Sequence, residues 1–171
     1  MTKGEWQTER LRLIPLDAAN LRLSIEDPRR LEANLCLEPR GTVPPEEVVQ
    51  ATRQMLDGIL RDPVNWLFYT DWSIVLKAQS RIIGGLCFKG TPDDQGRVEI
   101  GYGMDPCFQG HGYMTEALGE MVRWAFDQPF VITVVCETDR DNVASHRVLE
   151  EVGFASYKET EEHIWWRISP D

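Results

Sequence analysis

The residues best placed to do chemistry form a glycine-rich turn, where an extended segment gives way to a helix. The turn reads Gln109-Gly110-His111-Gly112-Tyr113-Met114, and Thr115 follows it. The first backbone N–H groups of a helix have no acceptor within the helix and lie at its positive end. Gly110 and Gly112 allow unusual dihedral angles and a close approach to these N–H groups. The pattern therefore predicts a phosphate or pyrophosphate site, with a purely structural turn as the alternative.

Two common nucleotide-binding motifs do not fit this turn. No lysine follows the second glycine, as a P-loop requires. The third glycine and the acidic ribose partner of a dinucleotide-binding fingerprint are missing as well. The turn thus predicts phosphate binding outside these two classes of nucleotide-binding protein.

The cysteines and histidines suggest no second reactive centre. The four cysteines and three histidines are scattered, so no structural zinc site and no bound metal is expected. Cys107 precedes the turn, but no histidine partner is recognisable for an acyl-cysteine intermediate. His111 is expected to face solvent, with phosphate contact as the alternative. The thiols are expected to be free, in a reducing compartment.

The charge and hydropathy of the chain exclude some classes of partner. The formal net charge is −10, which disfavours nucleic-acid binding. It suits a cationic substrate such as an amine, or serves only to keep the surface solvated. No stretch approaches the ~18 apolar residues of a membrane span, and residues 1–6 lack the apolar core of a secretory signal. A cytoplasmic location is expected.

The elements around the turn must hold it in place. Apolar residues recur at helical spacing from residue 113 onward, which predicts an amphipathic helix; they are Met114, Ala117, Leu118, Met121, Val122, Ala125 and Phe126. A strand at Arg97–Met104 precedes this helix. The apolar run Val131–Cys136 follows it, as expected for a strand covered on both faces. Strand, helix and strand in this order predict a parallel pair.

The remaining pattern predicts one α/β domain over residues 1–171. An edge strand at Thr8–Leu16 precedes three helices, at about 18–25, 28–35 and 45–60, that cover one face. Strands at Phe68–Leu76 and Arg81–Phe88 continue antiparallel into Arg97–Met104, with a bulge or close approach at Gly84-Gly85. A helix at Val143–Val152, capped by Asn142 and ended by Gly153, leads to a hairpin of Phe154–Glu159 and Ile164–Ile168.

The turn and its flanks resemble the GNAT superfamily of N-acetyltransferases. The signature Gln/Arg-x-x-Gly-x-Gly/Ala of that family matches Gln109-Gly110-His111-Gly112-Tyr113-Met114. Met114 stands where the family usually has glycine or alanine. Since Met114 also begins the apolar stripe of the helix, we interpret it as a packing variant.

The resemblance extends along most of the chain and is strongest to the ribosomal-protein alanine N-acetyltransferase branch. Val98–Tyr102 looks like the family's fourth strand, and Tyr113–Leu118 resembles the Gly-Tyr-Ala-Thr-Glu-Ala-Leu stretch of that branch. Asp141–Phe154 is similar to its Asn-x-x-Ser…Leu-Glu-Lys-x-Gly-Phe segment. Thr8–Leu13 matches its Thr-x-Arg-Leu-x-Leu opening. The resemblance implies a mixed, mostly antiparallel sheet of about seven strands with a splayed central parallel pair.

The family's mode of cofactor binding implies which residues hold acetyl-CoA here. The pantetheine arm would pair with backbone at Tyr102, Gly103 and Met104. The pyrophosphate would bind amides of the turn, and the hydroxyl of Thr115 would donate to it; the residues concerned are Gln109, Gly110, His111, Gly112, Tyr113, Met114 and Thr115. Asn142 and Ser145 would face the sulfur end, although Asn142 could be only a helix cap.

The resemblance also implies catalytic roles. A backbone N–H near Met104 would polarise the thioester carbonyl. Glu99 is the candidate base, with a solvated strand carboxylate as the alternative. Many GNAT enzymes place a tyrosine acid where Leu149 stands here. The leaving thiolate would then take its proton from Ser145 or from water.

The implied activity is direct transfer of an acetyl group from acetyl-CoA to an amine. A catalytically silent acyl-CoA-binding module is the alternative. The sequence does not decide whether the acceptor is a protein N-terminus, a polyamine, an amino acid or an aminoglycoside-like drug. It also does not decide whether the protein forms a homodimer. Segments 18–60 and 157–168 would choose the acceptor, with one of the adjacent Trp165 and Trp166 lining its site.

Overall fold

One mixed sheet of eight strands organises the part of the chain that the computed structural model describes, residues 6–170. The strands lie in the order β1-β2-β3-β4-β5-β6-β8-β7. All neighbours are antiparallel except the parallel pair β5 and β6. Their bounds are β1 Trp6–Gln7, β2 Leu11–Pro15, β3 Asp71–Leu76, β4 Arg81–Phe88, β5 Arg97–Met104, β6 Thr133–Asp139, β7 Ala155–Glu159 and β8 His163–Ile168.

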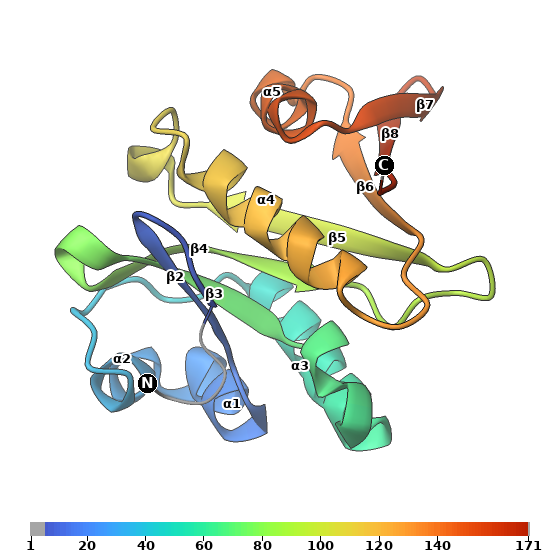
Figure 1. The fold of residues 1–171 in the computed structure, drawn as a ribbon. Coiled ribbons are helices and arrows are strands. Elements are labelled where there is room, and N and C mark those ends of the chain that lie inside the picture. Colours follow the sequence, from blue (N-terminus) through green and yellow to red (C-terminus); the bar gives the residue numbers. More distant parts are fainter. Residues whose placement is uncertain (1–5, 171) are drawn as a thin grey trace.

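Within residues 6–170, five α-helices cover the two faces of this sheet (Figure 1). Three of them lie on one face: α1 (Ala18–Glu26), α2 (Pro28–Asn34) and α3 (Glu46–Arg61). On the other face lies α4 (Tyr113–Phe126), with α5 (Val143–Val152) beside it. The predicted three-helix cap and the helix after the glycine-rich turn are therefore confirmed.

Each face of the sheet has its own apolar core. Trp72, Ile74 and Leu76 of β3 point toward α4, whose predicted apolar stripe is buried with them. Val75 points the other way, into a smaller cluster with residues of α1, α2 and α3. Because side chains alternate along a strand, the same strand contributes to both cores. Polar residues of β3 that point toward α1–α3 therefore lie inside the molecule.

Three predicted strands have bounds that differ by more than one residue, and one strand was missed. The edge strand expected at Thr8–Leu16 is β2, which spans Leu11–Pro15 and is not at the edge, because β1 pairs with its outer side. Residues 68–70 are not in β3, because Pro63–Phe68 forms a short 3-10 helix that Asp62 caps. The strand expected at 131–136 is β6, which begins at Thr133 and continues to Asp139. It buries alternate side chains instead of being covered on both faces. The extra strand is the two-residue β1.

The glycine pair of β4 confirms both interpretations made of it. The pairing of β3 with β4 shifts register between Ile74 and Val75, opposite Gly84 and Ile82. A Cβ atom on Gly84 would lie 2.4 Å from the carbonyl oxygen of Gly103 on β5. A bulge and a close approach of two backbones thus occur together, which explains why no side chain is tolerated there.

The parallel pair separates along its length, as the resemblance implied. β5 and β6 are paired only from Arg97–Thr133 to Glu99–Val135. Beyond that point β5 runs on beside β4, while β6 pairs with β8. The edge of β5 that includes Gly103 and Met104 is thereby turned toward the opening between the two strands.

Candidate active site

The glycine-rich turn has the backbone geometry of an anion site. Gly110 and Gly112 have φ angles of +77° and +76°, in the left-handed region that favours glycine. Gly112 is the N-cap of α4 and supplies no side chain to the first N–H groups of the helix. A Cβ on Gly110 would meet no atom within 4 Å, so the turn is open in front of this residue. The amides at the start of α4 are free to bind a phosphate group.

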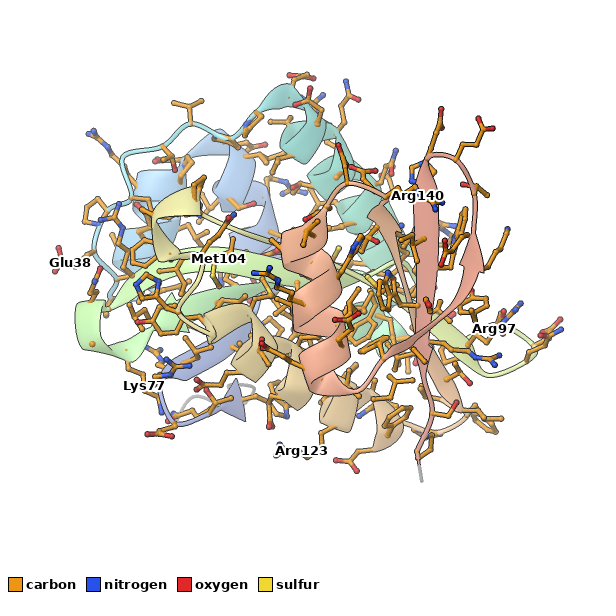
Figure 2. The ribbon with its side chains drawn as sticks, turned by 90° about the horizontal axis from the view of Figure 1, so that it is seen from above. Glu38, Lys77, Arg97, Met104, Arg123 and Arg140 are labelled. Atoms are coloured by element: carbon orange, nitrogen blue, oxygen red, sulfur yellow. The ribbon has the colours of Figure 1, made fainter. Side chains whose placement is uncertain are left out.

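The side chain of Gln109 ties the turn to the splayed strand. Its Nε2 donates to the carbonyl oxygen of Met104 at 3.1 Å. The His111 ring lies back over the turn, with Nδ1 2.9 Å from the carbonyl oxygen of Gln109. In Figure 2 Met104 lies at the opposite end of β5 from Arg97, beside the loop that leads to α4. The Gln109 hydrogen bond thus joins the turn to the end of β5.

Met114 and Thr115, at the start of α4, differ in how far their contacts were predicted. Met114 is buried in the core below α4, in agreement with its interpretation as a packing variant. The hydroxyl of Thr115 donates to Glu151 of α5 at 2.8 Å. That bond must break or be shared before Thr115 can donate to a phosphate.

Arg10 was not predicted to belong to the site, yet it lies against the turn. Its Nη1 donates to the carbonyl oxygen of His111 at 2.9 Å, and its guanidinium lies 4.6 Å from the centre of the Tyr113 ring. A 2.7 Å ion pair with Glu116 fixes the side chain. The sequence signal was the Thr-x-Arg-Leu-x-Leu opening, from which a resemblance was drawn but no role. Arg10 adds a positive charge beside the turn.

On the far side of the opening, α5 supplies Asn142 and Ser145. The side chain of Asn142 accepts from the backbone N–H of Ser145 at 3.1 Å, so the cap is confirmed. Tyr102 reaches across from β5, and its hydroxyl donates to the carbonyl oxygen of Ser145 at 3.3 Å. Burial raises the pKa of Tyr102, which keeps the phenol protonated. The sequence had assigned only the backbone of Tyr102 to the site.

Glu99 is held in an ion pair with Lys89. The Glu99 side chain is 32% exposed. It lies on the face of β5 that also carries Gly101 and Gly103, because these three residues alternate with buried Val98 and Ile100. It does not line the cavity described next.

A cavity of about 680 Å³ opens between the sheet and the cap helices. This volume falls within the range of small-molecule sites. Its floor is formed by β3, β4 and the end of β5, and its walls by α3 and the loop before it. Residues that line it include Arg40, Val48, Met55, Asp71, Ser73, Gly85, Gly103 and Met104.

The carboxyl of Asp71 is the feature of this cavity that the sequence did not indicate. Burial raises its pKa to about 6, against lowering by the Ser73 hydrogen bond and by Arg40. The Oγ atom of Ser73 donates to the carboxylate at 2.8 Å. Aspartate is uncommon in strands, so an aspartate at the start of the apolar strand β3 is the sequence feature that could have indicated a functional role.

Other residues noted in the sequence lie away from these features. Trp166 is buried and its Nε1 donates to Thr138, whereas Trp165 lies under Lys158 and does not line the cavity. The four cysteines are free, and burial raises the pKa of Cys87 to about 11 and of Cys136 to about 12. Within residues 6–170 no three metal-binding side chains cluster.

No helix among the described residues could span a membrane. The six N-terminal residues, in which no secretory signal was expected, lie outside the described part except for Trp6.

Comparison with known proteins gives a consistent result. Residues 10–155 match the family model described as "Acetyltransferase (GNAT) domain". The chain is 28% identical over 160 residues to the uncharacterized N-acetyltransferase YjdG of Bacillus subtilis, covering 94% of this chain and 95% of the relative.

Two solved structures show the same fold. Ribosomal-protein-S5-alanine acetyltransferase from Vibrio fischeri aligns with a TM-score of 0.70 at 19% identity, covering 99% of this chain and 98% of that one. The Microcin C7 self immunity acetyltransferase MccE, in complex with acetyl-CoA and AMP, aligns with a TM-score of 0.65 at 14% identity, over 99% and 98% of the two chains.

Proposed function

The chain belongs to the GNAT acetyltransferase family and is an acyltransferase, and we propose that it transfers an acetyl group from acetyl-CoA to a primary amine. The observation that carries this proposal is the conjunction of the open glycine turn with the end of β5 that pairs with β4 but not with β6. The curated N-acetyltransferase relative, matched over nearly its whole length, supports the same conclusion. No feature of the cavity or the turn favours the silent module.

The residues fit acetyl-CoA as a co-substrate. Left-handed Gly110 and Gly112 leave the amides at the start of α4 accessible, where a pyrophosphate would bind. Beyond the Glu99–Val135 pair, the backbone of Tyr102, Gly103 and Met104 faces the splay, where the amides of a pantetheine arm would find partners. We propose the sequence-derived set, Tyr102–Met104, Gln109–Thr115, Asn142 and Ser145, as its contacts, and we add Arg10.

The reaction then proceeds by direct attack of the neutral amine on the thioester carbonyl. The amine nitrogen forms the new amide bond, the carbon–sulfur bond breaks, and coenzyme A leaves as a thiolate. A backbone N–H near Met104 would stabilise the negative charge that develops on the carbonyl oxygen.

The two proton transfers need residues of their own. Glu99 is the base proposed from the sequence, and its ion pair with Lys89 engages the carboxylate. For the leaving thiolate, Ser145 was proposed from the sequence, and Tyr102 now joins it. The Tyr102 hydroxyl lies at the start of α5, bonded to the Ser145 carbonyl, and it is protonated. We propose Tyr102 as the donor in place of the tyrosine that Leu149 replaces.

The acceptor reaches the thioester through the cavity on the α1–α3 side. The cavity includes Gly103 and Met104 in its lining and opens past Val43, Pro45 and Val48. Val43 is 87% exposed. An opening with exposed apolar residues suits a small amine or the N-terminus of a peptide.

The test is release of free coenzyme A thiol from acetyl-CoA in the presence of a panel of amines. The panel contains alkylamines, polyamines, amino acids, and peptides with a free N-terminus. We expect amine-dependent thiol release and an acetylated product by mass spectrometry. If the folded protein binds acetyl-CoA but releases no thiol with any amine of the panel, the proposed acetyl transfer is wrong. The catalytically silent acyl-CoA-binding module would then be supported.

A further inference from the structure

Few charged side chains line the cavity. Among the described residues, the titratable side chains that line it are Arg40, Asp71, Cys87, Tyr102 and Asp105, of which Arg40 is the one cation. The lining residues that the structure describes on α1 and α3 are not titratable. Cys87 stays a neutral thiol at neutral pH, because burial raises its pKa to about 11.

Arg40 is already committed to another carboxylate. Its backbone N–H and its Nε donate to Glu32 Oε1 at 3.1 and 3.3 Å. Glu32 is 2% exposed, and this pairing satisfies its buried charge. The buried carboxylate near the cavity is thus paired with Arg40 through Oε1.

Asp71 differs from Glu32 in this respect. Within residues 6–170 it forms no ion pair, and its side chain accepts one hydrogen bond, from the Ser73 hydroxyl on Oδ2. A half-buried carboxylate with a single neutral donor is poorly stabilised. The other oxygen, Oδ1, lies over Gly85, where an added Cβ would come within 2.4 Å of it. The absence of a side chain at Gly85 gives this oxygen its place in the cavity.

The position of Asp71 connects it to the splayed strand. Ser73 pairs with Gly85 on β4, and Gly85 pairs with Gly103 on β5. Neighbouring strands lie about 4.8 Å apart. An amine that lies over Gly85 and contacts Asp71 Oδ1 would therefore be about one strand spacing from the backbone of Gly103. No side chain intervenes, because both residues are glycines.

We propose that Asp71 receives the ammonium group of the acceptor in this cavity and takes the proton that the amine must lose. This inference rests on the proposed function and assigns its first proton transfer. The ammonium N–H bond breaks, its proton forms the Asp71 carboxylic acid, and the neutral amine attacks the thioester carbonyl. The amine's second proton ends on the leaving thiolate. Asp71 then returns its proton to solvent.

Asp71 suits this role better than Glu99. Glu99 is paired with Lys89 and does not line the cavity, whereas Asp71 is unpaired and lines it. With a pKa of about 6, Asp71 is ionised at neutral pH and can still hold a proton for a short time. The groups that set this pKa are Ser73 and Arg40; Cys87 faces it from β4, and Tyr102 and Asp105 lie farther along the lining.

The first experiment measures binding without turnover. n-Butylammonium is titrated into the full chain and into the Asp71→Asn and Asp94→Asn variants, with n-butanol as the neutral probe. Asp94 lies exposed in the turn before β5, so its variant matches the charge change. We expect at least about tenfold weaker butylammonium binding in Asp71→Asn alone, and no change for butanol. Equal affinity in the two variants would overturn the proposal, whether or not acetyl transfer occurs.

The second experiment measures the pH dependence of kcat/KM with an alkylamine from the acceptor panel. The native chain should lose kcat/KM below pH about 6, where Asp71 becomes protonated, and should be flat above it. Asp71→Asn should be about 100-fold slower near neutral pH, with a rate that rises toward the amine's own pKa. The difference should narrow there, because a neutral amine needs no base. Acetyl-CoA affinity should not change in Asp71→Asn.

An Asp71→Asn profile that keeps the native plateau contradicts the assignment. Loss of the plateau in Glu99→Gln at the same time would return the role to Glu99. Gly85→Ala provides an independent variant, since its Cβ would displace Asp71 Oδ1; it should lower kcat/KM with the Asp71 carboxylate still present.

Discussion

The cofactor turn, residues 109–115, and the acceptor cavity lie on opposite faces of the sheet and meet at the end of β5. The turn is one short segment whose glycines, helix start and spacing are local properties of the chain. The cavity is assembled from β3, β4, β5, α3 and the loop before α3. The first region offers backbone amides to a ligand, and the second offers a few side chains.

The largest effect is expected from filling the turn. Gly110→Val places a branched side chain in the space that is open in front of the amides. We expect acetyl-CoA to bind about 100-fold more weakly, which is about 2.7 kcal/mol. Isothermal titration calorimetry measures this.

Gly41→Val is the matched control for that variant. Gly41 also has a left-handed φ, of +71°, and no atom within 4 Å of an added Cβ, but it lies in the loop before α3. Both variants should lose about 1–2 kcal/mol of stability through backbone strain. Equal loss of acetyl-CoA affinity in the two variants would show that the turn is not part of the acetyl-CoA site.

The second prediction concerns the loss of stability that the Asp71 carboxylate causes in the cavity. The pKa of Asp71 rises from 3.8 to about 6 on folding, so its charged form is disfavoured in the folded state. The native chain therefore loses stability as pH rises from about 4 to about 6, and stays lower above that. We expect the free energy of unfolding of Asp71→Asn to exceed that of the native chain by about 2 kcal/mol at pH about 8. Near pH 4 the two free energies of unfolding should be equal.

Urea denaturation at the two pH values measures this difference. A stability gain at high pH together with lost transfer would mark Asp71 as a residue retained for function at a cost in stability. Destabilisation at high pH would show instead that the carboxylate stabilises the fold.

The contrast between the regions also explains what the sequence could predict. Strand alternation, helical periodicity and caps such as Asn142 and Gly153 are local, and they predicted most elements and the turn. The start of β3 was misplaced because Phe68, an aromatic residue of a kind that strands favour, ends the 3-10 helix capped by Asp62. Asp71 was missed because its proposed role depends on two tertiary contacts, its approach to Gly85 and the pairing of Arg40 with Glu32. Contacts between residues so far apart in the chain cannot be read from local sequence patterns.

A third prediction tests the junction between the two regions. Tyr102→Phe keeps the buried ring but removes the hydroxyl that donates to the Ser145 carbonyl. If Tyr102 protonates the leaving thiolate, kcat should fall about tenfold or more. Acetyl-CoA affinity should stay within about twofold, since backbone groups make the binding contacts. An unchanged kcat would leave Ser145 or water as the donor.

The smallest effect is expected from Arg10. Its side chain is 42% exposed and is paired with Glu116, so its contribution is screened by water and salt. Arg10→Gln should weaken acetyl-CoA binding by about two- to fivefold at low ionic strength, and less at high salt. Affinity measured over a salt series checks this. A salt-independent loss would indicate that Arg10 acts by packing on Tyr113.

Hydrogen exchange of the backbone amides with and without acetyl-CoA tests whether the co-substrate binds at the start of α4 and along the edge of β5 that β6 leaves open. Acetyl-CoA should slow exchange in peptides that cover residues 101–104 and 109–115, and should leave α3 and its preceding loop unchanged. Protection confined to the α1–α3 side, or absent from both of these segments in a protein that binds acetyl-CoA, would contradict the account.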